Sequence, residues 1–357
     1  MVSVNNHKIK KQIIIAISVV LSVLFAGFLC VYFLFLHHYH GTNPTNAWNE
    51  TDTFNIASIK TVQKQTDKDF VILNLADIQM ADLEDIFHYG KIKSEIDELI
   101  KQTKPDLITL TGDQTWSNEN LISLTSLVRW LDGYKIPYAP VFGNHDYGNQ
   151  KNSAVLSQNA CCDLYERGKY SLFSRGPSNL GTLGNYIINI VDDGKIYKTL
   201  YMLDSGYEEK ITDEQIAWMN WNAEGIKQAN DGEYPEGMVF LHKPLPEYAY
   251  AYHELTYDQK QEIKPYFNYS LSGSMQNGFF DMAKTKNITD IVCGHQHGNN
   301  FTLSYEGVRL TFALKTGELG GYIENDEVYL NGATYITLAG ATTTINNYYV
   351  ERGKYHI

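Results

Sequence analysis

The stretch VFGNHDYG, residues 141–148, ends an apolar run with an amide, an imidazole and a carboxylate in direct succession. These three groups belong to Asn144, His145 and Asp146. The run itself, IPYAPVFG (136–143), is nearly continuous in apolar residues, which is the pattern of a strand covered on both faces. A buried strand that ends in adjacent polar groups predicts a binding or catalytic site at its carboxyl end.

Two strand and helix units precede this stretch. They are the predicted strands FVILNLAD (70–77) and DLITLTGD (106–113) and the predicted helices KIKSEIDELIKQT (91–103) and ENLISLTSLVRWLDG (119–133). Apolar residues three or four positions apart, such as Leu121, Leu124 and Val128, give each helix one buried face. Alternating strands and helices predict a parallel α/β arrangement, in which the carboxyl ends of the strands meet at one edge.

Two later segments repeat the pattern of a buried run that ends in histidine, namely MVFLHKP (238–244) and DIVCGHQHGNN (290–300). Residues 147–235 are more irregular, and we expect substrate-facing loops and further sheet elements there, within the same domain. The aromatic segment EYAYAYHELTY (247–257) is expected to form a loop. Its tyrosines 248, 250 and 252 either line the site as a stacking wall or pack within the sheet or loop.

Eight polar residues fall at or just beyond the ends of these five predicted strands. They are Asp77, Gln79, Asp113, Asn144, His145, His242, His295 and His297. Carboxylate, amide and imidazole groups together suit first-row metals such as Mn, Fe, Zn or Co, and the set is large enough for two ions. One carboxylate, most simply Asp113, could bridge two ions at roughly 3.5–4 Å, the separation used for in-line displacement at phosphorus.

Such a metal pair generates a bridging hydroxide nucleophile near neutral pH, so the chemistry needs no serine or cysteine nucleophile. Structural roles remain open for several of these residues. Asp77 and Asp113 also suit turns or helix caps, His242 suits a packed or capping position, and Gln79 suits a surface amide.

The ordered motifs resemble those of the calcineurin-like metallophosphoesterase superfamily. They are LADIQ (75–79), LTGDQ (110–114), FGNHD (142–146), FLHKP (240–244) and CGHQHGNN (293–300). Three further segments resemble the branch related to purple acid phosphatases, namely LDSG (203–206), TDEQIAWM (212–219) and LKTGELGGY (314–322). The resemblance covers residues 68–323 and implies a four-layer αββα sandwich with two mixed β-sheets.

The resemblance also implies a role for each motif residue. Asp77, Gln79, Asp113 and His297 would hold the first metal ion, and Asp113, Asn144, His242 and His295 would hold the second. His145 would contact the phosphate or protonate the leaving group, and Asp113 would take part in catalysis as the bridging ligand. Asp146 is expected to fix the loop.

Two positions depart from the family pattern. Gln79 stands where the common pattern has histidine, which is expected to weaken the first metal site or favour a harder ion. Trp116 stands where purple members carry the tyrosine that colours the iron, so we expect a colourless protein.

The N-terminus carries the clearest membrane signal. Residues 13–36, IIIAISVVLSVLFAGFLCVYFLFL, contain no charged residue, and as a helix they extend about 36 Å. Lys8, Lys10 and Lys11 precede the run, whereas the next Lys or Arg is Lys60, which predicts a cytoplasmic N-terminus. We expect a cytoplasmic segment (1–12), an uncleaved signal anchor (13–36), a linker with an entry strand (37–66) and an extracytoplasmic metallophosphoesterase domain (67–357). The chain would then be a single-pass protein of the cell membrane.

Composition limits the other function classes. The net charge of −12 argues against a nucleic-acid-binding surface built on bulk charge. The chain has four cysteines, too few and too unevenly spaced for a disulfide framework, and we expect free thiols. No feature of the sequence indicates the oligomeric state.

The sequence therefore predicts a membrane-anchored binuclear phosphoesterase. Two divalent or mixed-valence ions would act on phosphomonoesters, either small molecules or phosphoproteins. A phosphodiesterase or nucleotide phosphatase of the same fold is the nearest alternative. A catalytically silent surface protein that binds a phosphorylated ligand, with the first metal site weakened by Gln79, is the alternative from another class.

Overall fold

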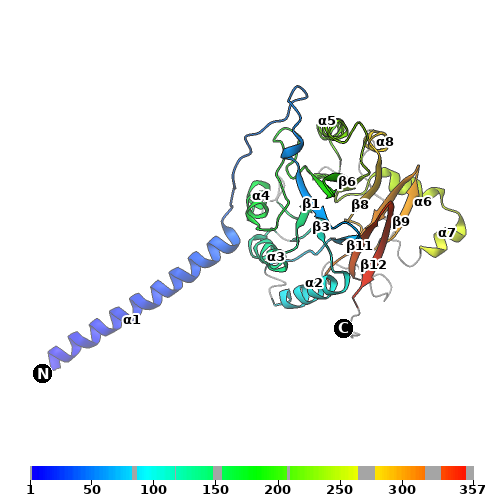
Figure 1. Cartoon of the computed structure of the whole chain (residues 1–357). Coiled ribbons are helices and arrows are strands. Elements are labelled where there is room, and N and C mark those ends of the chain that lie inside the picture. Colours follow the sequence, from blue (N-terminus) through cyan, green and yellow to red (C-terminus); the bar gives the residue numbers. More distant parts are fainter. Residues whose placement is uncertain are drawn as a thin grey trace.

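A long N-terminal helix projects from the globular part of the chain (Figure 1). This computed structural model describes residues 2–82, 87–116, 118–147, 155–206, 210–263, 278–317 and 331–350, with side chains from residue 10. Helix α1 (Val2–Val31) continues as the π-helix η1 (Tyr32–Leu36). The span from Lys10 to Leu36 has a mean hydropathy of 2.9 and is unburied, so it is long and apolar enough to cross a membrane.

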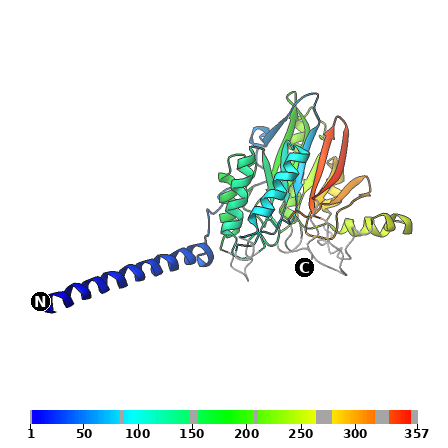
Figure 2. The same cartoon turned by 90° about the horizontal axis from the view of Figure 1, so that it is seen from below.

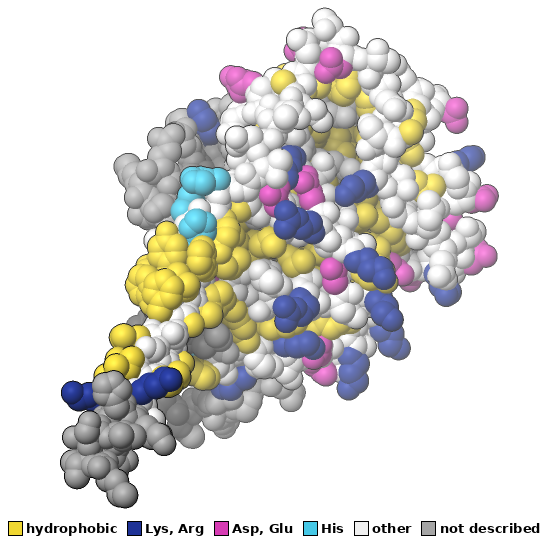
Figure 3. Space-filling model, turned by 90° about the vertical axis from the view of Figure 1, so that its left-hand side faces the viewer, with side chains coloured by type: hydrophobic (Ala, Val, Ile, Leu, Met, Phe, Trp, Pro, Cys, Tyr) yellow, Lys and Arg dark blue, Asp and Glu magenta, His cyan; other side chains and the backbone are white. Residues whose placement is uncertain are grey.

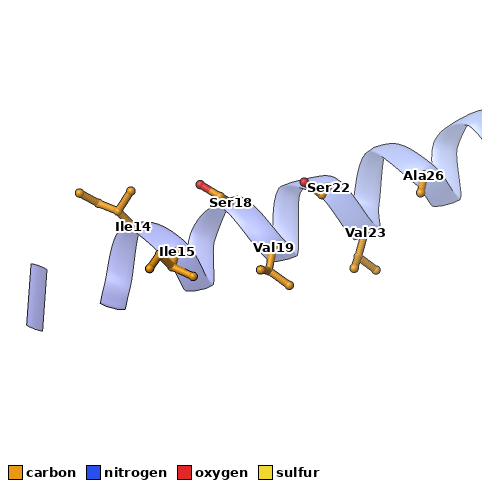
Figure 4. A pocket seen from close by; sticks show the side chains of 7 residues that line it. All are labelled: Ile14, Ile15, Ser18, Val19, Ser22, Val23 and Ala26. Atoms are coloured by element: carbon orange, nitrogen blue, oxygen red, sulfur yellow. The ribbon is translucent and has the colours of Figure 1, made fainter. Parts of the chain in front are cut away.

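The exposed side chains of α1 are almost all apolar. Figure 4 shows part of one surface of the helix, where Ser18 and Ser22 lie one turn apart on the same side between isoleucine and valine side chains. A helix that is apolar all round and covered by no other element matches a membrane environment better than water.

The first sheet has five strands and carries the predicted parallel core. In spatial order its strands are β12 (Thr342–Tyr349), β11 (Gly332–Ala339), β2 (Phe70–Leu75), β3 (Leu107–Thr111) and β4 (Tyr138–Val141). Strands β2, β3 and β4 are parallel, as the sequence pattern predicted, and β11 and β12 are antiparallel additions. The carboxyl ends of the three parallel strands therefore lie at one edge of this sheet.

The second sheet has seven strands and is also mixed. In spatial order they are β1 (Lys60–Lys64), β5 (Tyr186–Asp192), β6 (Lys195–Met202), β7 (Gly237–Phe240), β8 (Ile288–Cys293), β10 (Val308–Phe312) and β9 (Thr302–Tyr305). Strands β6, β7 and β8 run parallel to one another.

Helices cover the outer face of each sheet. Helices α2 (Tyr89–Thr103), α3 (Leu121–Tyr134) and α4 (Gln158–Arg167) lie on the side of the five-stranded sheet, and Figure 2 shows α2 in cyan alongside the strands. Helices α5 (Asp213–Ala229), α6 (Pro246–Glu254), α7 (Tyr257–Glu262) and α8 (Phe279–Thr285) lie on the side of the seven-stranded sheet. The predicted αββα fold class is confirmed.

Two apolar cores follow from these layers. Along β6 and the residue after it, Leu200 and Met202 pack in the core that the two sheets share, whereas Tyr201 and Leu203 pack in the core beneath α5, α6 and α8. Successive side chains of a strand point to opposite faces, so one strand with apolar residues at every position contributes to both cores.

Two sequence expectations were wrong in detail. Residues 147–235 contain the helices α4 and α5 as well as sheet elements, and the start of α5 has a capping box between Thr212 and Gln215. Residues 247–257 are mostly helical and not a loop, because α6 begins with a proline at its first turn. Tyr248 is buried in the second core, where its hydroxyl donates to the carbonyl oxygen of Ile291 at 2.7 Å.

Residues 37–58 form a segment that we call the strap, which joins η1 to β1 and packs along the domain. It is mostly irregular and ends in the short 3-10 helix η2 (Ile56–Ser58). The backbone N–H and hydroxyl of Thr42 both donate to Asp163 at 3.0 Å, and the N–H of Trp48 donates to Asn179 at 2.9 Å. Near its end, the ring of Phe54 lies over Gly225 of α5, where a Cβ would come within 2.2 Å of that ring. The strap is therefore bound to the domain along its length.

Candidate metal centre

The eight predicted site residues gather where the carboxyl ends of strands from both sheets meet. Asp77 and Gln79 follow β2, Asp113 follows β3, and Asn144 and His145 follow β4. His242 follows β7 of the other sheet, and His295 and His297 follow β8. Because each residue lies just past a strand end, the sheet architecture itself brings five segments of sequence to one rim.

Two groups of potential metal ligands share one carboxylate. Asp113, His242 and His295 form one group, and Asp77, Asp113 and His297 form the other. Within each group the ligand atoms lie within 4.8 Å of one another. Asp113 is thus placed between two clusters, which is the position that a bridging ligand of two ions requires.

His242 lies at the centre of the first group. Its Nδ1 donates to the carbonyl oxygen of Thr111 at 2.8 Å, which leaves Nε2 to face the other ligands. Nε2 lies 3.1 Å from Oδ1 of Asn144, 3.2 Å from Nδ1 of His295 and 3.3 Å from Oδ2 of Asp113. Three potential ligands therefore converge on the free nitrogen of one oriented imidazole.

Asp77 connects the two histidines of the GHQH motif. Its carboxylate accepts from the backbone N–H of His295 at 3.0 Å, and its Oδ1 lies 3.3 Å from Nε2 of His297. Burial raises the pKa of Asp77, but His297 outweighs this and holds the pKa below its usual value. The carboxylate is therefore ionised, as a metal ligand must be.

Four of the site residues have left-handed backbone conformations. Asp77, Gln79, Asp113 and His295 have φ angles of 51°, 55°, 52° and 69°. Each such residue costs about 1 kcal/mol relative to an ordinary conformation. Strain of this kind concentrates at functional sites, and here it lies at the corners between strand and loop that carry four of the predicted ligands.

Glycines in the motifs allow the ligands to approach. A Cβ on Gly143 would lie 2.2 Å from Oδ1 of Asp113, and a Cβ on Gly294 would lie 2.6 Å from Oδ2 of Asp77. Both contacts are shorter than side chains tolerate. The glycine that precedes Asn144 and the one that precedes His295 are therefore required by the close packing of the carboxylates.

Gln79 provides a test of whether the residues fit a metal ion. Its side chain is 1% exposed, and neither Oε1 nor Nε2 has a hydrogen-bond partner. A buried amide without partners is unfavourable by about 1–3 kcal/mol, so this side chain fits a role as a ligand of an ion. The backbone N–H of Gln79 donates to the carbonyl oxygen of Asp113 at 2.9 Å, which holds its segment next to the loop after β3. The donor set and this amide together fit a metal centre.

His145 lies at the exposed side of the centre. Its backbone N–H donates to Oδ1 of Asp113 at 2.8 Å, and its ring stacks on the indole of Trp116, with 4.2 Å between centroids and 25° between planes. Burial lowers the pKa of His145, and the charge of Asp113 partly opposes this. The ring is held beside the ligands and remains accessible to a substrate, since its side chain is 35% exposed.

Asp146 fixes the loop, as expected. Its carboxylate accepts from the backbone N–H of Gly143 at 2.7 Å and from that of Thr115 at 2.9 Å. Burial and the nearby charge of Asp113 raise the pKa of Asp146 to about 8. The residue joins the loops after β3 and β4 and shapes the site from behind.

The sequence reasoning missed two contributors to the site. The hydroxyl of Tyr147 donates to the buried carboxylate of Asp204 at 3.0 Å, which ties the loop after β4 to the end of β6 in the other sheet. Lys315 donates to the backbone carbonyl of Asp77 from the segment after β10. No structural role was assigned from the sequence to the LDSG motif, which carries Asp204, or to the LKTG motif, which carries Lys315. Residues 318–322 of the latter motif lie outside the described residues.

A four-layer sandwich whose two sheets share a rim of carboxylate, amide and imidazole groups is the architecture of a metal-dependent phosphoesterase. The chain belongs to the calcineurin-like phosphoesterase family, whose profile matches residues 70–299. This membership classes the chain with hydrolases of phosphoester bonds and confirms the resemblance seen in the sequence motifs.

Two curated relatives extend the match. Phosphatase DCR2 of Saccharomyces cerevisiae is 26% identical over 269 residues, which cover 68% of this chain and 46% of the yeast protein. "Probable inactive purple acid phosphatase 14" of Arabidopsis thaliana is 24% identical over 259 residues, which cover 64% of this chain and 62% of the plant protein. The chain thus spans less than two thirds of either relative.

Among solved structures, a dimetal phosphatase from Danio rerio aligns with a TM-score of 0.52. The alignment covers 78% of this chain and 95% of the zebrafish chain at 11% sequence identity. At this level of identity the likeness is one of fold, and it agrees with the two mixed sheets described above.

Proposed function

We propose that this protein is a membrane-anchored phosphoesterase that binds two metal ions and hydrolyses phosphomonoesters. The observation that carries the proposal is Asp113, which belongs to two ligand groups and is buried between strands of one sheet and histidines of the other. One oxygen of Asp113 holds the backbone of His145, and the other faces His242, so the carboxylate is placed to serve both ligand groups of a binuclear centre.

In this proposal Asp77, Gln79, Asp113 and His297 hold one ion, and Asp113, Asn144, His242 and His295 hold the other. The donor set suits Mn, Fe, Zn or Co. Bound ions would supply Lewis-acid chemistry, in that they lower the pKa of water and neutralise charge on a phosphate ester. The chain's own residues orient the ions: Thr111 fixes the tautomer of His242, and the loop fixed by Asp146 sets the position of Asn144.

His145 would act on the substrate directly. Its ring is partly open to solvent and stacked on Trp116. From this position the imidazole would contact the phosphate or deliver a proton to the leaving-group oxygen. The substrate is a phosphate ester carried by a small molecule or a protein.

The membrane part of the proposal rests on α1 and η1. The apolar span from Lys10 to Leu36 would anchor the chain, with its lysine-flanked end in the cytoplasm. Residues 67–357, together with the strap, would then lie on the extracytoplasmic side of the cell membrane.

A second candidate function is a catalytically silent protein that binds a phosphorylated ligand. Gln79 favours it, because a neutral amide in place of an imidazole weakens a metal site, and because the Arabidopsis relative carries the word inactive in its name. In this case the fold and one metal ion would remain without turnover.

Metal content and hydrolysis measured on the full chain in detergent separate these candidates. The parent protein and its Asp113→Asn variant would be loaded with Mn, Fe, Zn or Co and assayed with 4-nitrophenyl phosphate. Two ions per chain, with hydrolysis well above that of Asp113→Asn, support the enzyme. One ion and no hydrolysis above the variant support the binding protein, and Gln79→His would then raise the content to two.

A further inference from the structure

We infer that the phosphate ester hydrolysed by this protein is carried by a lipid headgroup of the same membrane that holds α1. The inference rests on the proposed function and names its substrate class. The inference is based on where the chain enters the domain after the apolar span. It enters at the edge of the sheet that carries the metal centre.

The strap joins the domain at Tyr39, three residues after the apolar span ends. The backbone N–H of Tyr39 donates to the carbonyl oxygen of Val155 at 2.7 Å, and the N–H of Ser157 donates back to Tyr39 at 3.0 Å. The peptide group between Val155 and Leu156 continues the connection, because its N–H, that of Leu156, donates to Oδ1 of Asn120 at 2.9 Å. Nδ2 of Asn120 in turn donates to the carbonyl oxygen of Asp146 at 2.8 Å. A short chain of hydrogen bonds therefore runs from the membrane end of the strap to the loop that carries Asn144 and His145.

These bonds limit the distance between the membrane and the site. Peptide and amide dimensions place the carbonyl oxygen of Asp146 within about 13 Å of the N–H of Tyr39. Three extended residues between Leu36 and Tyr39 add at most about 10 Å. A globular domain of this size is about 50 Å across, so the metal centre lies in the half nearer the membrane.

The junction holds the domain in place. The hydroxyl of Tyr39 donates to the carbonyl oxygen of Phe33 in η1 at 3.0 Å, and its ring lies 4.6 Å from that of His37, edge to face. The helix η1 also packs against α3, the helix that starts beside the site. Figure 3 shows apolar side chains that continue from α1 onto the adjoining surface of the domain, with histidines beside them. These contacts therefore fix both the distance of the domain from the apolar span and its orientation relative to that span.

Exposed aromatic side chains lie at the same edge of the sheet. Trp116 is 41% exposed and stacks on His145. Its segment is bound to the partner of Tyr39, because the backbone N–H of Val155 donates to the carbonyl oxygen of Asn118 at 2.7 Å. Phe87 is 93% exposed and precedes α2. This helix connects β2 to the parallel strand β3, so it starts at the edge where β2 ends. Large aromatic groups of this kind are favoured in the headgroup layer of a bilayer.

A fixed, short distance between the membrane and the metal centre suits a lipid substrate. Lipid headgroups present their phosphates at a nearly constant height above the membrane, whereas phosphoproteins present theirs at variable heights. The headgroup layer is about 5–8 Å thick on each side. The bonds at Tyr39 keep the loop of Asn144 and His145 within about 23 Å of the end of the apolar span, so a small tilt of the domain brings the loop to that layer. The geometry therefore favours a phosphomonoester lipid over a protein substrate.

The test compares a lipid and a soluble substrate with the full chain in phosphatidylcholine vesicles. The lipid is phosphatidic acid, and the soluble substrates are 4-nitrophenyl phosphate and a phosphoserine peptide. One variant carries four EAAAK repeats between Leu36 and His37, which form a helical spacer that lifts the domain by about 30 Å. Asp113→Asn is the inactive control, and all rates are expressed relative to that on 4-nitrophenyl phosphate.

We expect the parent chain to hydrolyse phosphatidic acid and the spacer variant to lose at least about 10-fold of that relative rate, because the substrate is no longer presented at the site. A relative lipid rate that survives the spacer overturns the inference. So does a parent chain that hydrolyses 4-nitrophenyl phosphate or the peptide but not the lipid, and the proposed function then stands. Rates equal to those of Asp113→Asn on every substrate overturn both.

Discussion

The ring of His145 lies against the indole of Trp116, with 4.2 Å between the centroids and 25° between the planes. One face of the imidazole is thus covered, and rotation about its side-chain bonds is restricted. The backbone of His145 is held separately, by its hydrogen bond to Asp113. Trp116 therefore positions the ring without contributing to the loop's attachment.

Replacement of Trp116 should affect substrates that need a proton for their leaving group. A stacked aromatic pair is worth about 0.5–1.5 kcal/mol, so Trp116→Ala should lower kcat on an alkyl phosphate by about 2- to 12-fold. Trp116→Phe keeps a ring at this position and should stay close to the parent. Rates on 4-nitrophenyl phosphate, whose leaving group needs little protonation, should change less. Equal losses on the two substrates would show that Trp116 has a general structural role.

The shared position of Asp113 predicts a distinctive pattern of metal content. His297→Ala should remove one ion and His295→Ala the other, whereas Asp113→Asn should reduce the binding of both, because the bridging carboxylate serves each group. Elemental mass spectrometry of the purified variants measures this. If Asp113→Asn loses no more metal than either histidine variant, the two groups do not share a ligand.

The unpartnered amide of Gln79 predicts opposite effects with and without metal. In metal-free protein Gln79→Leu should leave the free energy of unfolding unchanged or raise it by about 1 kcal/mol, because an unsatisfied buried amide is removed. In metal-loaded protein the same change should reduce the stabilisation that the ions provide. Urea unfolding with and without metal gives both values. A clear loss of stability in the metal-free variant would mean that Gln79 makes stabilising contacts of its own.

The protonation of His242 predicts a pH dependence. Burial lowers its pKa, but the charges of Asp113 and Asp77 outweigh burial and raise it from 6.5 to about 9 in the metal-free protein. The folded state is then favoured by the charged imidazole below pH 6.5, and this contribution is lost as the pH rises through 9.

Metal binding requires neutral His242, so the apparent metal affinity should rise over the same pH range while the stability of the metal-free protein falls. Metal titration and thermal unfolding between pH 6 and about 9.5 measure the two trends. Metal affinity independent of pH in this window would contradict a ligand role for His242.

The contact between Phe54 and Gly225 predicts a way to loosen the strap. A Cβ at residue 225 would lie 2.2 Å from the ring, so Gly225→Ala should displace Phe54 and destabilise the protein by about 1–3 kcal/mol. Gly90→Ala is a matched control, since a Cβ on that helical glycine meets nothing within 4 Å. Limited proteolysis should cut residues 37–58 faster in Gly225→Ala than in the control or the parent. Equal cleavage would show that the strap does not depend on this contact.

The sequence predicted those parts of the site that follow from strand ends. Asp77, Asp113 and His242 could be placed together because each ends a buried apolar run, and parallel strands bring such ends to one edge. The parallel order of β2, β3 and β4 follows from the same pattern and is confirmed.

Contacts between distant segments were beyond sequence reasoning. The stack of Trp116 on His145 depends on how two loops pack, and the bridge between Tyr39 and Leu156 joins residues far apart in the chain. The helix α6 was missed because its tyrosines alternate as in a strand, whereas the proline at its start and burial of Tyr248 in the second core decide the conformation. At these positions tertiary packing decides the structure, and the local pattern of residues does not predict it.

The left-handed backbone of Asp77, Gln79, Asp113 and His295 has a consequence for protein engineering. A graft that copied only these side chains onto another parallel sheet would aim them along the strands and miss the common rim. The unit that can be transplanted is the set of strand-to-loop corners, with the glycines that give them room. Directed evolution of a new ligand set in this scaffold should therefore accept side chains that tolerate such corners, above all asparagine and aspartate, more readily than β-branched ones.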